Sequence, residues 1–188
     1  MTAEILDKNT VHEGWAKYSV LTVRLADGTT AKRELEEHGP AVTVLPYDPE
    51  RKVATLVRQF RAPVLAAAGE ATSTEAIAGL TDGEDPQEAA RREALEETGL
   101  KLSALEPVGF LWTMPGLSTE RMYLYLAPYA ETGKVGKGGG AKGEHENITV
   151  LELSLRELAA MADDGRLADM KTFALLQTLR LRKPELFV

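Results

Sequence analysis

The chain has 188 residues, of which 44% are hydrophobic and 27% charged, so it fits one globular domain with a real core and a small extension. A formal net charge of −7 argues against general nucleic-acid binding, and the absence of cysteine excludes disulfides, thiol catalysis and cysteine-based zinc sites. No apolar run approaches membrane-spanning length and the first ten residues lack the features of a secretory signal, so we expect a cytoplasmic protein.

The first predicted element is a β-hairpin. Residues 15–25 and 29–35 alternate loosely between apolar and polar side chains, and the Asp-Gly pair at 27–28 is a turn signal. A hairpin has little core of its own and needs a partner surface, in the domain or in a second subunit. We therefore predict an N-terminal extension over residues 1–38 and a main domain over residues 39–188.

Strands and helices are predicted in the main domain as follows. The expected strands span residues 40–47, 53–60, 74–78, 105–113, 121–127 and 148–153, and the expected helices span residues 86–98, 154–163 and 169–182. Residues 61–73 are predicted to be loop, and the glycine-rich stretch 132–147 to be mobile because it cannot pack. The apolar residues at helical spacing in the last helix are expected in the core: Phe173, Leu175, Leu176 and Leu179. Strands followed by helices indicate an α+β layered fold.

The first of these helices places three glutamates on one face. Asp85 can cap the helix and Gly99 can end it, and between them Glu93, Glu96 and Glu97 are three and four residues apart. Like charges at this spacing repel by about 0.2–0.5 kcal/mol per pair when exposed, and by about 4 kcal/mol when partly enclosed at an effective dielectric near 20. A divalent cation removes the repulsion, and carboxylate oxygens suit a hard ion such as Mg²⁺.

The same stretch resembles the Nudix box, a pattern of a glycine, a glutamate, Arg-Glu, an aliphatic residue, Glu-Glu and Gly-aliphatic at fixed spacing. The matching residues are Gly79, Glu84, Arg92, Glu93, Ala94, Glu96, Glu97, Gly99 and Leu100. The loop between Gly79 and Glu84 is one residue shorter than usual, which leaves the role of Glu84 open but keeps the helical spacing. From the glutamates alone, a solvated acidic face with Arg91 and Arg92 as surface partners is the alternative.

The resemblance implies a Nudix-type α/β/α sandwich around a mixed sheet, with the N-terminal β-hairpin as an extension. It also implies a pyrophosphatase that depends on Mg²⁺, with Mn²⁺ as a substitute. Glu93, Glu96 and Glu97 would hold the metal together with the backbone carbonyl of Ala78, and Glu97 would thereby take part in catalysis.

Three further segments resemble the branch of this family that cleaves ADP-ribose and GDP-mannose. Arg58 and Arg61 are the ends of an Arg-Gln-Phe-Arg segment, similar to a Gln-Phe-Arg segment that holds phosphate or nucleotide in that branch, whereas alone they would be typical of surface charge. Glu75 would orient an arginine or contact the nucleotide, unless it is an ordinary edge-strand residue. Glu146, or failing it Glu144, matches the acidic loop residue that acts there as general base; from the sequence alone this is a polar loop end.

The resemblance covers residues 40–182, and the short box loop and the glycines at 138–140 are similar to the GDP-mannose subgroup. We therefore predict hydrolysis of a nucleoside diphosphate sugar, of the GDP-mannose or ADP-ribose type, to a nucleoside monophosphate and a sugar phosphate. A homodimer is expected because the hairpin region often exchanges between subunits in such proteins. The alternatives are a catalytically silent Nudix-fold module that binds a nucleotide sugar for regulation, which the intact box glutamates disfavour, and an interaction domain built on the hairpin.

Overall fold

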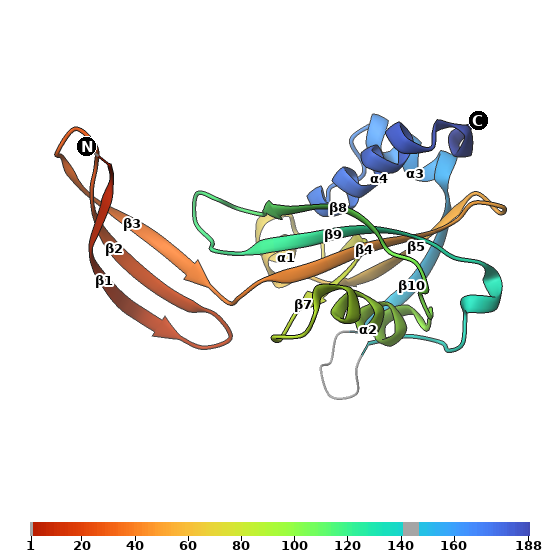
Figure 1. Cartoon of the computed structure of the whole chain (residues 1–188), viewed down its shortest axis with the longest axis horizontal. Helices are drawn as coiled ribbons and strands as arrows, with labels where there is room; N and C mark the ends of the chain where they lie inside the picture. Colours follow the sequence, from red (N-terminus) through yellow and green to blue (C-terminus); the bar gives the residue numbers. More distant parts are fainter. Residues whose placement is uncertain (1, 141–146) are drawn as a thin grey trace.

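The computed structural model describes residues 2–140 and 147–188 and contains two β-sheets (Figure 1). The strands are β1 (Glu4–Glu13), β2 (Lys17–Arg24), β3 (Thr30–Glu37), β4 (Ala41–Asp48), β5 (Val53–Phe60), β6 (Thr72–Glu75), β7 (Ile77–Leu80), β8 (Glu106–Trp112), β9 (Arg121–Pro128) and β10 (Thr149–Ser154). The helices are α1 (Ala62–Ala68), α2 (Pro86–Thr98), α3 (Leu155–Asp163) and α4 (Met170–Arg182), with 3₁₀ turns η1 (Glu131–Gly133) and η2 (Pro184–Phe187).

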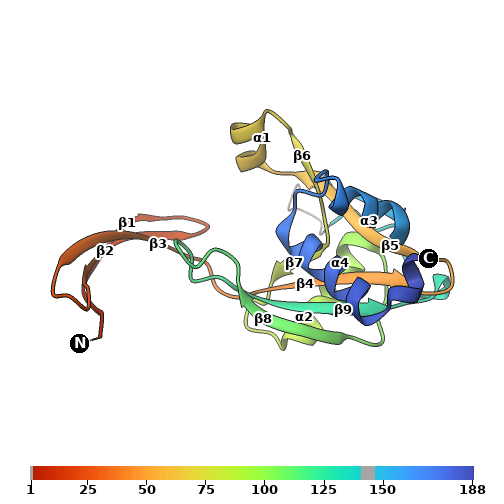
Figure 2. The ribbon, with the colours of Figure 1, turned by 90° about the horizontal axis from the view of Figure 1, so that it is seen from above.

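The larger sheet has seven strands and lies between α2 on one face and α3 with α4 on the other (Figures 1 and 2). Its main order is β10-β5-β4-β9-β8, and β4 and β9 are parallel while the other pairs are antiparallel. All eight residues of β4 are buried, as expected for a central strand covered on both faces. The predicted α+β fold, with its α/β/α sandwich around a mixed sheet, is confirmed.

Two apolar clusters hold the layers together. On the α4 side, Leu45, Leu56 and Leu126 pack with Leu175, Leu176 and Leu179 of the helix, all fully buried. On the α2 side, the cluster is built from small residues of the helix and apolar residues of the sheet: Ala89, Ala90, Ala94, Val42, Val44, Val57 and Tyr125. Burial of one such leucine contributes roughly 1.5–3 kcal/mol, so these layers dominate the stability of the domain.

The sheet divides beside its central strand. Residues 41–44 of β4 pair with β7, whereas Tyr47 and Asp48 pair with β5, so β5 and β7 share one side of β4. The strand predicted at 74–78 is therefore two short strands, of which β6 pairs with β5 and β7 with β4. Between them, the backbone N–H of Ala76 donates to Oγ1 of Thr172 on α4 at 2.6 Å, which fixes the point where the two strands separate.

The predicted hairpin corresponds to β2 and β3, but β1 adds a third strand that the sequence analysis did not predict. The apolar residues of β1 do not alternate, and all ten of its residues are exposed, so it lacks the pattern of a half-buried strand. This sheet projects from the main body (Figure 1). It joins the β8–β9 connection through backbone hydrogen bonds from Glu36 N to Leu117 O (2.9 Å) and from Thr119 N to Glu36 O (3.0 Å).

The predicted loop at 61–73 contains helix α1 and the start of β6. Alanines favour the helix, Pro63 suits its first turn, and Gly69 ends it with a φ of 75°. None of its residues is buried, and the helix projects from the body (Figure 2). The prediction failed because α1 has no periodic apolar face that packs on the core.

The remaining predicted strands and helices agree with the structure to within two residues. Two further expectations are wrong. Phe173 is 41% exposed rather than part of the core. The described part of the glycine-rich stretch does pack: Gly139 N donates to Glu97 O (2.9 Å) and Gly140 N to Glu96 O (3.1 Å), because glycine allows two backbones to approach closely. Among the described residues, no helix has the length and apolar character needed to cross a membrane.

Candidate active site

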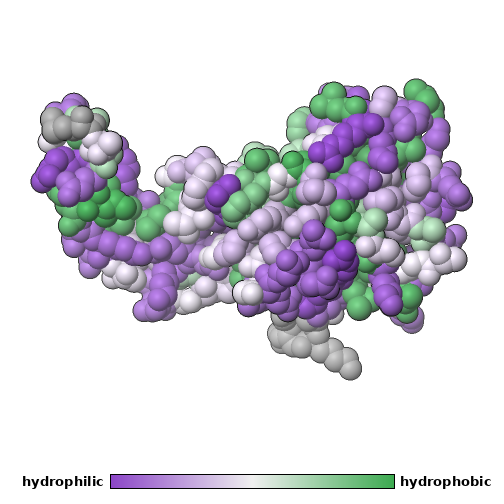
Figure 3. Space-filling view, viewed as in Figure 1, coloured by the Kyte–Doolittle hydropathy of each residue, from purple (hydrophilic) through white to green (hydrophobic). Residues whose placement is uncertain are grey.

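Helix α2 begins and ends where its capping residues predict. The Asp85 side chain accepts hydrogen bonds from Gln87 N (2.9 Å) and Glu88 N (3.3 Å), and Gly99 ends the helix with a φ of 71°. Figure 3 shows a hydrophilic surface gathered over this helix, so its polar face is turned outward. Its opposite face is made of alanines that lie against the sheet, which brings the backbone of α2 close to β7.

Arg92 links the carboxylates of α2. Its Nη1 donates to Glu93 Oε1 (2.8 Å) and to Glu96 Oε2 (3.1 Å), and its Nε donates to Glu84 Oε2 (3.1 Å). Nη2 donates to the carbonyl oxygen of Leu80 at 3.2 Å, which ties the guanidinium to the end of β7. Burial alone would lower the pKa of Arg92, but the hydrogen bonds from it to these carboxylates raise it, so the guanidinium stays charged. Glu84 therefore acts as a partner of Arg92 in this structure.

Gly79 of β7 lies against the side chain of Glu93 on α2. A Cβ atom at position 79 would overlap Oε1 of Glu93 and lie 2.7 Å from its Oε2, so only glycine leaves the carboxylate this space. The Glu93 side chain is 13% exposed, and the whole of Glu97 is 2% exposed. Ala78 precedes Gly79 in β7 and pairs with Thr43 of β4.

These groups suit a hard divalent cation. The carboxylates of Glu93, Glu96 and Glu97 and the carbonyl of Ala78 are all oxygen donors, the class that Mg²⁺ prefers. In residues 2–140 and 147–188, no three acidic or histidine side chains already surround one point as metal ligands would. Arg92 donates hydrogen bonds to two of these carboxylates, those of Glu93 and Glu96.

A second group of charges lies at the end of β5. Arg61 donates through Nε to Glu75 Oε1 and through Nη2 to Glu75 Oε2, both at 2.9 Å, which is the bidentate geometry of a strong pair. Lys171 Nζ donates to Glu75 Oε2 at 2.5 Å and to Asp169 Oδ1 at 3.0 Å. Asp169 in turn caps α4 by accepting from Thr172 N at 3.0 Å. Two cations thus share the buried Glu75 carboxylate.

The pKa shifts of this group follow from burial and pairing. Burial alone would raise the pKa of Glu75, but the hydrogen bonds and charges of Arg61 and Lys171 outweigh it and lower the pKa to about 2. The hydrogen bond to Glu75 raises the pKa of Arg61, and the negative charges of Glu97 and Asp169 add to this effect. The negative charge of Glu97 on α2 therefore acts on the Arg61 guanidinium.

Residues of both groups line one open cleft with a volume of about 1100 Å³. The sequence-predicted residues that line it are Arg58, Arg61, Glu75, Ala78 and Glu93. Glu96 and Glu97 do not line it and lie further along α2. Below, "acidic wall" means the α2 group of Glu93, Glu96 and Glu97 with Arg92, of which Glu93 and Arg92 line the cleft, and "basic wall" means Arg61 and Lys171 with Glu75.

Some cleft residues were not predicted from the sequence: Trp15, His38, Glu120, Arg166, Asp169 and Lys171. In the sequence, Lys171 is typical of a polar residue in the first turn of a helix. Its partner Glu75 lies 96 residues earlier, so no local pattern links the two. Trp15 and His38 come from the N-terminal sheet, where Trp15 is 76% exposed and its ring lies 4.7 Å from that of His38.

The other predicted residues have separate outcomes. Arg58 lies at the exposed end of β5, and its Nε donates to Thr74 Oγ1 at 3.3 Å, a weaker contact than the pair made by Arg61. Glu144 and Glu146, the predicted general bases, lie outside the described residues.

Comparison with known proteins gives a consistent result. A model of the NUDIX domain matches residues 37–175. A GDP-mannose pyrophosphatase of Cronobacter sakazakii is 40% identical over 152 residues, which are 80% of this chain and 78% of that protein. Another, from Pectobacterium atrosepticum, is 36% identical and covers 95% of this chain and 94% of its own length. The crystal structure of an ADP compounds hydrolase matches the whole chain and 98% of its own chain, with a TM-score of 0.79 and 20% identity, which shows a shared fold.

Proposed function

We propose, from the premise that this chain belongs to the Nudix family, that it is a pyrophosphatase that hydrolyses a nucleoside diphosphate sugar. The observation that carries the proposal is that Glu93 and Arg92 of the acidic wall line the same cleft as the basic wall. A diphosphate has two requirements that these walls meet: cations to neutralise its oxygens and oxygen ligands for a divalent ion.

GDP-mannose is the substrate that we propose first. Support comes from the relatives named GDP-mannose pyrophosphatase, which match over most of their own length. ADP-ribose is the second candidate, because the fold is shared with an enzyme that hydrolyses ADP compounds. The products would be a nucleoside monophosphate and a sugar phosphate, since the oxygen of water bonds to one phosphorus atom while the bridging P–O bond of the anhydride breaks and the bridging oxygen leaves with the other phosphate.

Nudix hydrolases generally need divalent cations, and we propose Mg²⁺ here, with Glu93, Glu96, Glu97 and the Ala78 carbonyl as its ligands. Such an ion supplies Lewis-acid stabilisation of the diphosphate oxygens and lowers the pKa of water. Arg61 would fix the diphosphate through its guanidinium N–H groups, of which Nη1 is not engaged by Glu75 in the bidentate pair.

Glu146, with Glu144 as the alternative, remains our proposal for the general base that takes the proton of the attacking water. The other candidate function is a silent module that binds a nucleotide sugar without turnover. The engagement of Glu93 and Glu96 by Arg92 is the observation that favours it. The presence of all three box glutamates on α2 supports the enzyme.

One assay separates these functions. The purified chain is incubated with Mg²⁺ and a panel containing GDP-mannose, ADP-ribose and other nucleotide sugars, and phosphate is measured after a phosphatase is added. We expect phosphate only when both the chain and the phosphatase are present, and most of it from GDP-mannose. Tight binding of a nucleotide sugar without turnover of any member of the panel would contradict the enzymatic function and support the silent module.

We further propose a homodimer in which the extension at residues 1–38 contacts a second subunit, and a cytoplasmic location, which cell fractionation tests. The fully exposed β1, with Ile5 and Val11 more than half exposed, supports a partner for this sheet. Light scattering should give twice the chain mass for the intact protein and the chain mass for a variant that lacks residues 1–35. A monomer in both cases would remove the proposal.

A further inference from the structure

The glycine segment (residues 133–140) binds the carboxyl end of α2. The last carbonyl groups of a helix lack partners within the helix and need donors from elsewhere. Here Gly139 N donates to Glu97 O (2.9 Å) and Gly140 N donates to Glu96 O (3.1 Å). Val135 N and Gly136 N both donate to Gly99 O, at 2.9 and 3.2 Å. The donors therefore come from a segment some forty residues later and reach the carbonyls of two proposed metal ligands.

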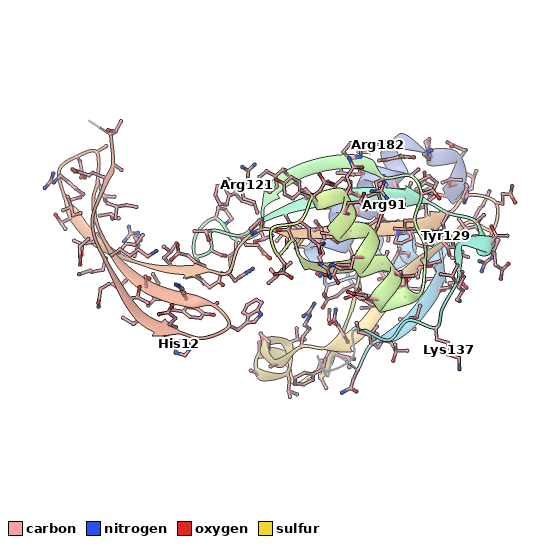
Figure 4. The ribbon with its side chains drawn as sticks, turned by 60° about the horizontal axis from the view of Figure 1, so that its bottom comes forward. His12, Arg91, Arg121, Tyr129, Lys137 and Arg182 are labelled. Atoms are coloured by element: carbon pink, nitrogen blue, oxygen red, sulfur yellow. The ribbon has the colours of Figure 1, made fainter. Side chains whose placement is uncertain are left out.

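Close approach of the two backbones makes these hydrogen bonds possible. A Cβ atom at Gly138 would overlap the carbonyl oxygen of Glu97 and lie 2.5 Å from Cα of Thr98. Both are backbone atoms, so no side-chain rotation relieves the overlap, and the φ of +67° at Gly138 also favours glycine. By contrast, a Cβ at Gly136 would meet its nearest neighbour, Cα of Gly99, at an ordinary 3.5 Å. The neighbouring Lys137 is exposed and points away from the body (Figure 4).

We infer that Gly138 is a positioning residue: its missing side chain lets the glycine segment hold the last turn of α2, and with it Glu96 and Glu97, in place relative to Glu93. This inference rests on the proposed function in one respect, namely that Glu96 and Glu97 are metal ligands. A side chain at position 138 pushes the segment away, which leaves the carbonyls of Glu96 and Glu97 to water and lets the last turn loosen. The basic wall is not touched by this change.

The test compares Gly138→Ala with Gly136→Ala, which changes the same segment without overlap. Gly28→Ala serves as a second control, because Gly28 also has a positive φ (+87°) but nothing within 4 Å of its Cβ. Three quantities are measured: Mn²⁺ binding by calorimetry, amide hydrogen exchange of peptides covering residues 93–100 and 133–140 in the metal-free protein, and kcat with KM for GDP-mannose.

For Gly138→Ala we expect Mn²⁺ binding at least tenfold weaker, exchange at least tenfold faster in both peptides, and kcat at least tenfold lower with KM changed less than twofold. Both controls should match the wild type. Wild-type Mn²⁺ binding and exchange in Gly138→Ala would overturn the inference, as would equal losses in Gly136→Ala.

If Gly138→Ala does not fold, Gly139→Ala strains the same segment more gently, since its Cβ meets open space at a φ of +114°. If the wild type turns over no nucleotide sugar, the proposed function fails, while Mn²⁺ binding and exchange still decide the role of Gly138.

Discussion

The two walls of the cleft have opposite arrangements of charge. In the acidic wall, Arg92 is shared by several carboxylates; in the basic wall, Glu75 is shared by two cations. The basic wall is satisfied within the protein, because Glu75 is buried and fully paired, so it is a rigid part of the fold. In the acidic wall, three carboxylates lie within about one turn of α2, and those of Glu93 and Glu96 accept from the same guanidinium, so like charges lie close together there. The difference suggests that the acidic wall serves chemistry, and that the basic wall serves both stability and substrate binding.

The largest effect is expected from the acidic wall. Glu93→Gln and Glu97→Gln should each lower kcat more than about 100-fold at saturating Mg²⁺, because the neutral amide lacks the negative charge with which a carboxylate holds a divalent ion. Thermal stability should change little or rise, since like charges are removed from one face. Glu88→Gln is the control on the same helix, because this side chain is exposed and pairs with Arg91. Near wild-type turnover in either ligand variant would make the metal assignment wrong.

A large loss of stability is expected from Glu75→Gln in the basic wall. Removing this carboxylate leaves Arg61 and Lys171 facing each other, which should cost on the order of 3 kcal/mol in unfolding free energy at pH 7. Because the pKa of Glu75 is lowered to about 2 in the folded protein, its stabilisation is present above its usual pKa near 4.5 and is lost as the pH falls towards 2. Urea unfolding at pH 7, 4 and 3 should show the gap between wild type and variant closing below about pH 4.5. A gap that stays constant over this range would contradict the assigned pairing.

A smaller effect is expected at the contact between β7 and α2. Gly79→Ala should displace the Glu93 carboxylate and lower kcat about tenfold, with less than about 1 kcal/mol lost in stability because the displaced group is the flexible end of a side chain. Gly116→Ala is a suitable control, since no atom lies within 4 Å of its added Cβ. Unchanged kcat and Mg²⁺ dependence in Gly79→Ala would show that the position of this carboxylate does not matter.

The smallest effect is expected at Arg58. Its single 3.3 Å contact with Thr74 contrasts with the bidentate pair of Arg61. Arg58→Ala should therefore raise KM only a fewfold, whereas Arg61→Ala should raise it about tenfold or more through loss of a charge-assisted contact. Equal losses in the two variants would mean that the walls hold the substrate differently from our proposal.

The local parts of the site could be predicted from the sequence, because short-range rules decide them. Asp85 and Gly99 fix the ends of α2, and the helical period then fixes the common face of Glu93 and Glu97. The long-range parts could not be predicted in this way. Lys171 joins Glu75 through the packing of α4 on the divided sheet, and no local pattern encodes a partner 96 residues away. The glycine segment was wrongly predicted to be mobile, because its composition shows only that it has few side chains to pack. In the fold, its backbone N–H groups donate to the carbonyl groups at the end of α2.

The arrangement of α1 has a consequence for engineering. This helix buries none of its residues, and the stretch that contains it is closed at its base by a hydrogen bond from Arg61 N to Ala71 O at 3.1 Å. A segment of this kind can be exchanged for a shorter or longer one at little thermodynamic cost. Since Pro63 and Val64 line the cleft, such grafts would reshape the entrance while both walls stay intact. The α1 stretch is therefore a part of the cleft lining whose length and sequence can be varied without changing either wall.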